Sequence, residues 1–431
     1  MTRILLTGIS DSLNNGGMAM AISAANTLKK IIPDAEFSIL SSHFDIDRRR
    51  YAPYGIKVIE RTWRGSKIKA KKRLTRIIIL ASLALITLFN FVLMRIIKSK
   101  KNKLYTKSIG EFFASDIIID INGDSLTEDY GFPMGALFEI LLGIITGNPV
   151  VIYAQSIGPF KSKMTKFSAK FVFNRVSLIT VREEITYKYM RELGIKTPVY
   201  LTAESAFLLE PASNESINRI LSEEGIRLNE KPLIGISPSR IIYRYGFPDC
   251  EHPTEKYRGY IRIMAKITDY IIDKLNATVI FIPHVIASDN DDRVVSKDIY
   301  MSVRNKHKVK IITYECTADE LKGLIGICDL FIGCRMHATI ASTSMLVPTI
   351  AIAYSSKTHG IIGKMLGQEE LVIDIRKLKS DELLSELKSK INYAYENRDS
   401  IRNNLREKIK MMRNLASLNG VLVKNLLARH Q

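Results

Sequence analysis

The sequence predicts an α/β protein built from two doubly wound domains, each with a parallel sheet, and three observations support this. The chain has 431 residues, which is enough for two domains. Short apolar runs alternate with helical patterns along most of it, as expected for strands that helices cover on both faces. These runs form two series, and the polar stretch 211–231 between them is predicted to be a linker.

The first series predicts an N-terminal Rossmann-like domain over residues 1–210. Helical patterns such as Met18–Ile32 and Glu183–Leu193 fall between several of its apolar runs. The predicted strands are Arg3–Thr7, Glu36–Leu40, Lys57–Glu60, Asp116–Ile121, Pro149–Ala154, Leu178–Val181 and Val199–Thr202.

The second series predicts a C-terminal Rossmann-like domain over residues 232–378. Its strands are predicted at Leu233–Ser237, Thr278–Pro283, Val309–Tyr314, Asp329–Ile332, Thr349–Ala353 and Leu371–Asp374. The last segment, 379–431, contains a helical pattern rich in Lys and Arg at Ser380–His430. We expect these C-terminal helices to pack across one or both domains.

The net charge of +19 is concentrated in one segment. Between Arg61 and Lys107 there are 14 basic residues and no acidic residue, so the rest of the chain carries only +5. The basic clusters 64–76 and 95–103 contain no aromatic side chains for base stacking, and we therefore predict no nucleic-acid partner.

The same segment, 61–107, has an apolar centre. Ile77–Met94 is an uncharged run of 18 residues with clustered Lys and Arg on both sides. A run of this length is marginal for crossing a bilayer, and one crossing would put predicted strands of a single sheet on opposite sides. A buried core helix with a basic loop and a true membrane span are the alternatives. We favour a helical segment that lies in one leaflet of an anionic membrane, attached from the cytoplasmic side.

The cysteines and the N-terminus predict a reducing, cytoplasmic compartment. The four cysteines are scattered without C-x-x-C spacing, which argues against a disulfide scaffold or a zinc ribbon. The apolar run after Met1 reaches Gly8 too soon for a signal-peptide core.

Polar loops follow several predicted strands, where ligands bind in doubly wound folds. In the first domain these loops contain Asn15-Gly16-Gly17, Asp124 and Gln155. The glycines open a predicted helix whose free amides could face an anion or a sugar hydroxyl. They do not form a G-x-G-x-x-G motif, so a dinucleotide site is disfavoured.

The loops of the second domain carry five cationic or titratable side chains with few carboxylates beside them: Arg240, His284, Arg335, His337 and Lys357. Guanidinium groups pair with phosphate and carboxylate, and the helix predicted after Arg335 adds oriented amides. The sequence therefore predicts a site for a strongly anionic ligand.

We expect no metal in this site. There is no H-E-x-x-H motif, and the D-x-D spacing at Asp289 and Asp291 is better explained as a helix cap after His284. Cys334, next to Arg335, is expected to be a small packed residue because no base for a thiolate nucleophile is evident.

These motifs resemble those of the polysaccharide pyruvyl transferase family. The resemblance covers most of the chain except 61–107, and Cys334-Arg335-Met336-His337-Ala338 followed by a small-residue helix is its most specific element. The other matching stretches are Asn15-Gly16-Gly17, Asn122-Gly123-Asp124-Ser125, Ala154-Gln155-Ser156-Ile157-Gly158-Pro159, Val181-Arg182-Glu183-Glu184, Thr202-Ala203-Glu204 and Gly235-Ile236-Ser237-Pro238-Ser239-Arg240. The family usually continues its first turn with Gly-Asp-Glu-Ala, whereas this chain has Gly17-Met18-Ala19.

The resemblance implies a GT-B-like fold with two domains facing a cleft, and pyruvyl transfer without a cofactor. The implied donor is phosphoenolpyruvate as co-substrate, and the implied product is a pyruvyl ketal on a sugar of a cell-surface or lipid-linked glycan. His337 and Arg335 would be catalytic, and Arg240, Arg335, His284 and Lys357 would bind the donor. The acceptor would lie on the first domain, at Asn15, Gly16, Gly17, Asp124 and Gln155.

Two other functions compete with pyruvyl transfer. A nucleotide-sugar glycosyltransferase of the same architecture also places His or Arg at this helix start, but it commonly follows with an acid that holds the ribose. Here the helix begins Ala338-Thr339-Ile340-Ala341-Ser342, without an acid, which favours the smaller donor. A membrane-bound scaffold without activity is the second alternative. A homo-oligomer is compatible with the sequence.

Overall fold

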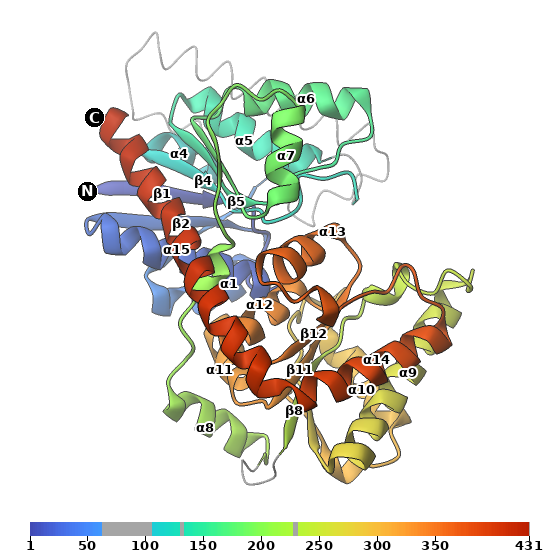
Figure 1. Cartoon of the computed structure of the whole chain (residues 1–431). Helices are drawn as coiled ribbons and strands as arrows, with labels where there is room; N and C mark the ends of the chain where they lie inside the picture. The colour runs from blue at the N-terminus through green and yellow to red at the C-terminus, as the bar shows by residue number, and fades with distance from the viewer. Residues whose placement is uncertain (63–105, 130–132, 227–231, 431) are drawn as a thin grey trace. The chain divides into compact units, whose positions relative to one another are not determined.

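The computed structural model describes residues 1–62, 106–129, 133–226 and 232–430 (Figure 1). The chain divides into two compact units. Unit 1 comprises Met1–Ser12, Met20–Ser205 and Leu415–Gln431, and unit 2 comprises Leu13–Ala19 and Ala206–Asn414. This division differs from the predicted ranges at both ends of the chain, because Leu13–Ala19 belongs with unit 2 and the last helical turns belong with unit 1.

Unit 1 contains a seven-stranded sheet in the order β3-β2-β1-β4-β5-β6-β7, and every pair within it is parallel. All seven strands predicted from the sequence are confirmed to within two residues at each end. They are β1 (Thr2–Thr7), β2 (Ala35–Ser41), β3 (Ile56–Glu60), β4 (Ile117–Asp120), β5 (Val150–Gln155), β6 (Leu178–Val181) and β7 (Val199–Leu201).

Helices cover both faces of this sheet, which explains why its central strands β4, β5 and β6 are buried throughout and mostly apolar. On one face α4, α5 and α6 form a continuous layer, while the end of α15 packs against α1 at Gly420. Unit 1 contains most of α1 (Asn15–Ile31) and the end of α15 (Arg398–His430). It also contains α2 (Phe44–Tyr51), α4 (Lys107–Ala114), α5 (Met134–Thr146), α6 (Lys163–Phe173) and α7 (Glu184–Glu192).

Unit 2 contains a six-stranded parallel sheet in the order β10-β9-β8-β11-β12-β13. The six predicted strands are again confirmed, with the largest difference at the end of β10. The strands are β8 (Leu233–Ser237), β9 (Thr278–Phe281), β10 (Val309–Ile311), β11 (Leu330–Gly333), β12 (Thr349–Ala353) and β13 (Val372–Asp374). The strand order reverses between β8 and β11, so their carboxyl ends diverge into loops suited to ligand binding.

The helices of unit 2 lie on both faces of its sheet as well. They are α8 (Asn214–Glu223), α9 (Pro253–Leu275), α10 (Asp292–Ser302), α11 (Ala318–Gly326), α12 (Met336–Ser344), α13 (Ser356–Thr358) and α14 (Ser380–Glu396). Short 3-10 helices lie at Ala52–Tyr54, Ser205–Leu208, Ile242–Arg244, Lys306–Lys308 and Glu369–Leu371, and a π-helix lies at His359–Met365.

The predicted linker, 211–231, contains the helix α8 instead of an extended chain. Ser213 caps it by accepting a hydrogen bond from the amide of Ser216, and Ile217, Ile220 and Leu221 recur at helical spacing. These side chains are buried in the hydrophobic core of unit 2. The polar composition of the stretch concealed this narrow apolar stripe.

The predicted C-terminal helical run, Ser380–His430, forms two helices that separate at Asn397. The second, α15 (Arg398–His430), supplies residues to both units. Within unit 1, the buried Asn419 holds α15 by donating to the carbonyl of Ala203 (3.0 Å) and accepting from the hydroxyl of Thr202 (2.9 Å). The segment is therefore divided between the two units, which agrees with the expectation that it packs across one or both domains.

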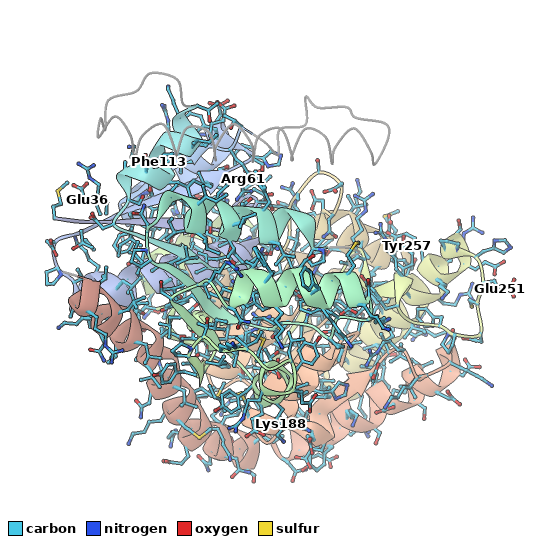
Figure 2. The ribbon with its side chains drawn as sticks, turned by 90° about the horizontal axis from the view of Figure 1, so that it is seen from above. Glu36, Arg61, Phe113, Lys188, Glu251 and Tyr257 are labelled. Atoms are coloured by element: carbon cyan, nitrogen blue, oxygen red, sulfur yellow. The ribbon has the colours of Figure 1, made fainter. Side chains whose placement is uncertain are left out.

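The basic segment 61–107 lies mostly outside the described residues. Its first member, Arg61, is not part of a solvated basic face, because its guanidinium is buried and pairs with Glu139 of α5 (Nε to Oε1, 3.2 Å). Figure 2 labels Arg61 among the side chains of unit 1. No helix of the described residues combines the length and the apolarity needed to cross a membrane.

A second buried carboxylate lies next to this ion pair. Asp120, at the end of β4, accepts hydrogen bonds from the Thr7 hydroxyl (3.2 Å) and from the side-chain amide of Gln155. Burial, and then the charge of Glu139, raise the pKa of Asp120 to about 6. The native chain therefore holds a proton on this carboxyl at pH values where an unfolded chain has released it.

We predict that the stability of Asp120→Asn relative to the wild-type protein increases as the pH rises. Between about pH 4 and pH 6 the native wild-type protein binds more protons at Asp120 than the unfolded chain does. The free energy of unfolding of the wild-type protein therefore falls by up to about 3 kcal/mol as the pH rises through this range. The asparagine variant lacks this loss. Urea unfolding of both proteins at pH 4 and pH 7 measures the effect, and an equal difference at the two pH values would contradict it.

Candidate functional site

The predicted anion-binding residues of unit 2 follow the carboxyl ends of its strands. Arg240 comes after β8, His284 after β9, and Lys357 after β12. Arg335 directly precedes α12 and His337 lies in its first turn, just beyond β11. The predicted placement of these five residues at one edge of the sheet is therefore correct.

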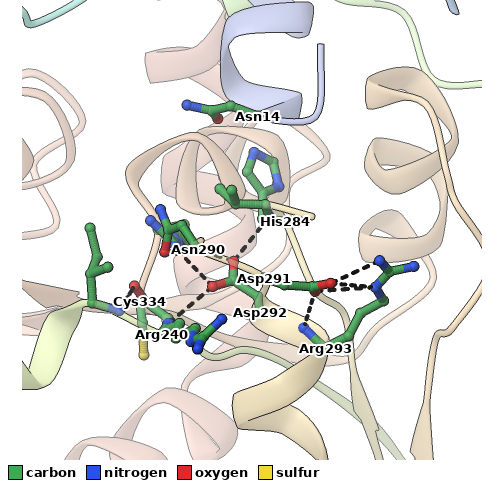
Figure 3. A network of polar contacts seen from close by, with 12 residues as sticks. Asn14, Arg240, His284, Asn290, Asp291, Asp292, Arg293 and Cys334 are labelled. Atoms are coloured by element: carbon green, nitrogen blue, oxygen red, sulfur yellow. Dashed lines mark hydrogen bonds and ion pairs between the residues drawn. The ribbon is translucent and has the colours of Figure 1, made fainter. Parts of the chain in front are cut away.

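The organising residue of this edge is one that sequence reasoning missed, Asp292 at the start of α10 (Figure 3). Its buried carboxylate accepts two hydrogen bonds from the Arg335 guanidinium, from Nε (3.1 Å) and Nη2 (2.6 Å). It also accepts from the backbone amides of Arg240 (3.0 Å) and Val285 (3.0 Å). One carboxylate thus joins the loops after β8, β9 and β11.

Arg335 is consequently held in a buried ion pair, contrary to the expectation of few carboxylates nearby. Its Nη2 also donates to Asn290 Oδ1 (2.8 Å). Burial by itself lowers the pKa of Arg335, but the Asp292 carboxylate outweighs it and the pKa is raised. In the described part of the chain Nη1 of Arg335 makes no hydrogen bond. The pairing with Asp292 therefore fixes the guanidinium and leaves Nη1 available to a ligand.

His284, one of the predicted donor-binding residues, lies in surroundings that disfavour a charged imidazole. Its imidazole is buried, and neither ring nitrogen has a hydrogen-bond partner among the described residues. Burial first, then the charges of His337 and Arg335, lower its pKa to about 3. At neutral pH this ring can exchange hydrogen bonds with a ligand, but it adds no charge.

The N-terminal turn lies beside these histidines, inside unit 2 and not on the first domain as predicted. Asn15 donates its backbone amide (3.3 Å) and its side-chain amide (3.1 Å) to the carbonyl of His284. Asn14 and Val285 form an isolated antiparallel bridge, and Asn14 lies beside His284 in Figure 3. The segment Leu13–Ala19 is thus a structural part of the second unit.

Gly16 lies against the imidazole of His337. A Cβ at position 16 would overlap Nδ1 of that ring and lie 2.7 Å from its Cγ. A side chain at this position would therefore displace the imidazole, so glycine is required here for close approach. This contact places the half-buried His337 next to the first turn of α1.

The remaining predicted cations occupy the same edge in different surroundings. The Arg240 side chain is half-buried. Burial raises the pKa of the Tyr257 phenol, and the positive charge of Arg240 acts in the opposite direction. Lys357 is buried within α13. Tyr245 and Tyr354, from the loops after β8 and β12, stack with ring centroids 4.8 Å apart.

Cys334 is the packed residue that the sequence predicted. It is buried, accepts a hydrogen bond from the Tyr260 hydroxyl (3.4 Å), and burial raises its pKa to about 12. The predicted cap is also confirmed, because Asp291 is the N-cap of α10 and accepts from the amide of Arg293. Among the described residues no cluster of three His, Cys, Asp or Glu side chains could hold a metal ion.

The other two predicted acceptor residues, Gln155 and Asp124, lie in unit 1. Gln155 is fully buried, and its amide nitrogen is taken up by Asp120, so this side chain serves the interior and not an acceptor. Asp124 is half-buried in the loop after β4. Nearby, Arg182 donates Nε to the Ser156 hydroxyl (2.8 Å) and pairs with Glu204, so these family-like residues form a buried ion pair.

These features define the class of the protein. Two doubly wound units, each with a parallel sheet, and a cationic site at the strand ends of the second are consistent with a GT-B-like fold. Solved structures with this fold are similar over nearly the whole chain. They include Anabaena Alr3699/HepE in complex with UDP and glucose (TM-score 0.55, 12% identity, 100% of both chains). Another is the UDP-GlcNAc 2-epimerase from Methanocaldococcus jannaschii (TM-score 0.53, 10% identity, 91% of this chain and 92% of that one).

The chain belongs to the polysaccharide pyruvyl transferase family, whose sequence model matches residues 14–356. It is also 26% identical to the amylovoran biosynthesis protein AmsJ of Erwinia amylovora over 296 residues, which are 66% of this chain and 67% of that protein. The resemblance noted from the motifs is thereby confirmed, and the family is one of transferases in polysaccharide biosynthesis.

We predict that Gly16→Ala moves the His337 imidazole. The added methyl would overlap the ring, so the ring must shift at a cost of about 1–3 kcal/mol in the free energy of unfolding. The measurement compares the chemical shifts of the His337 ring in variant and parent protein labelled at histidine. Gly110→Ala is the matched control, because a Cβ there meets no atom within 4 Å. Unchanged chemical shifts of the His337 ring in Gly16→Ala would disprove the contact.

Proposed function

We propose that this protein transfers the enolpyruvyl group of phosphoenolpyruvate to a sugar of a cell-surface or lipid-linked glycan and forms a pyruvyl ketal. Membership of the family supports this proposal. The observation that carries it is the fixed guanidinium of Arg335, held by Asp292 at the start of α12 and two residues from His337.

The charges at this edge suit a small trianion. Phosphoenolpyruvate carries a phosphate and a carboxylate on a three-carbon frame, so each contact must be strong and charge-assisted. Nη1 of Arg335 and the guanidinium of Arg240 would bind these groups, with Lys357 as a further cation. The amides that open α12 would add the positive end of a helix dipole. These groups would offset the donor's charge without a metal ion.

The transfer would proceed through protonation of the donor's methylene carbon. His337, as imidazolium, gives a proton to that carbon, and positive charge develops at the neighbouring carbon that bears the phosphate. A sugar hydroxyl attacks this centre, and the bond to phosphate breaks. A second hydroxyl of the same sugar then closes the ketal. Of the two protons that the hydroxyls release, one returns to His337 and one leaves with phosphate, so the balance is complete.

The start of α12 favours this donor over a nucleotide sugar. The first turn of α12 contains no acidic residue, so it offers no carboxylate to the hydroxyls of a ribose. The fold alone does not decide between the two donors, because the solved structures that share it include a complex with UDP. The distinction rests on the site.

We also propose an acceptor that is presented at the inner face of the cell membrane. Asp124 and the turn Asn15-Gly16-Gly17 would contact this acceptor, whereas Gln155 would not, because it is buried. The basic and apolar sequence of 61–107 supports attachment to anionic lipid from the cytoplasm. A lipid-linked sugar would be reached from there.

We predict phosphate release from phosphoenolpyruvate in the presence of glycan acceptors, and no nucleotide release from a panel of nucleotide sugars. His337→Ala should lower the rate at least 100-fold, the order expected for loss of a general acid. His307→Ala, an exposed histidine in the same unit, is the control and should be fully active. Undiminished turnover in His337→Ala would remove that residue from the mechanism, and nucleotide release would overturn the donor.

We predict that replacing residues 63–105 by a short Gly/Ser linker moves most of the protein from the membrane fraction to the soluble fraction. The described ends of the segment permit this change, because the hydroxyls of Thr62 and Thr106 are 3.3 Å apart. Fractionation of cells that express each form measures the effect. Unchanged membrane association would show that another surface holds the protein there.

A further inference from the structure

Helix α6 of unit 1 exposes an apolar stripe to solvent. Met164 is 64% exposed, Phe167 73% and Phe171 44%. At 100° per residue these positions fall on one narrow face of the helix. Thr165, Ala169, Val172 and Phe173 face the interior instead. The stripe is therefore additional to the face that α6 packs against its own sheet.

Cations border this stripe. Lys163, Lys166 and Lys170 are exposed and follow one flank of it, and Arg175 lies over the ring of Phe171 with its Cζ 3.6 Å from the ring centroid. Between Pro159 and Arg175 the sequence has five basic residues and no acidic one. The carboxylate of Glu128 contacts the start of α6, where it accepts a hydrogen bond from the backbone amide of Ser162 (3.0 Å).

This combination fits a lipid surface better than a second protein. Bulky apolar side chains beside lysines are typical of helices that lie in a membrane interface, where the apolar groups enter the acyl boundary and the ammonium groups reach anionic headgroups. Lysine is depleted at the centres of protein interfaces, and a stable one needs roughly 800 Å² from each partner. A two-fold contact between copies would also bring the same lysine flank against itself.

The position of α6 agrees with this assignment. Its layer continues through α5 to α4, and α4 begins directly after Thr106, where the basic segment rejoins the described chain. Figure 1 shows α4, α5 and α6 within the same part of unit 1. The stripe and the ends of the segment therefore belong to one helical layer.

We infer that the exposed face of α6, formed by Met164, Phe167, Phe171 and the flanking lysines, is a docking surface for an anionic membrane. It is distinct from segment 61–107, and it does not rest on the proposed transfer chemistry. Its role would be to hold unit 1 in one orientation on the lipid surface. A single attachment point would leave that orientation free.

The test is co-sedimentation of the full chain with vesicles of phosphatidylcholine, with and without about one third phosphatidylglycerol. Each α6 variant is made in the natural chain and in the form with a linker in place of 63–105. In the linker form we expect residual, salt-sensitive binding to the anionic vesicles only. Met164→Ser with Phe167→Ser should weaken that binding roughly tenfold or more. Replacing Lys163, Lys166 and Lys170 by Gln should weaken it comparably.

Met301→Ser is the matched control, since Met301 is 63% exposed on α10 of the other unit, and it should bind as the parent does. Equal binding by the α6 variants and this control would overturn the inference, as would a linker form that binds no vesicles. A change in sedimentation mass without a change in vesicle binding would also overturn it, because the stripe would then join copies of the chain. Phosphate release in solution, measured in parallel, separates these results from failure of the proposed activity.

Discussion

A single buried carboxylate, that of Asp292, is the constraint on which the site depends. It is paired with the Arg335 guanidinium and takes backbone amides from two further loops, so its charge is compensated by groups that must all be in place together. The same contacts fix where Nη1 of Arg335 lies before any ligand arrives. Because this guanidinium is already oriented, no free energy is lost in ordering it when charge develops during the proposed transfer.

Residues near the start of the chain also form part of this site. The turn at Leu13–Ala19 joins unit 2, where Asn15 holds the carbonyl of His284 and Gly16 touches His337. The imidazole proposed to move the proton thus lies close to the start of the chain as well as to the strand ends of unit 2. His284, whose pKa burial lowers to about 3, adds no further positive charge there at neutral pH.

The fold is shared more widely than any one chemistry. Similar solved structures have only 9 to 13% sequence identity to this chain and include proteins in complex with UDP. This chain is characterised by local features, namely the Arg-x-His at the start of α12, a first turn of α12 without an acid, and membership of the polysaccharide pyruvyl transferase family. On its surface α6 combines apolar groups with cations, and the sequence of 61–107 has the same combination.

The sequence by itself determined the strands, the two sheets and the edge at which the cations gather, because apolar runs buried on both faces leave a strong local pattern. It also determined the family, through short motifs of contiguous residues. Only the tertiary structure decided that Asp292 pairs with Arg335, that Gln155 is buried, that His284 is neutral and that Asn15 and Gly16 belong to unit 2. Those outcomes depend on contacts between residues tens to hundreds of positions apart and on loss of water, and neither leaves a periodic trace in the sequence.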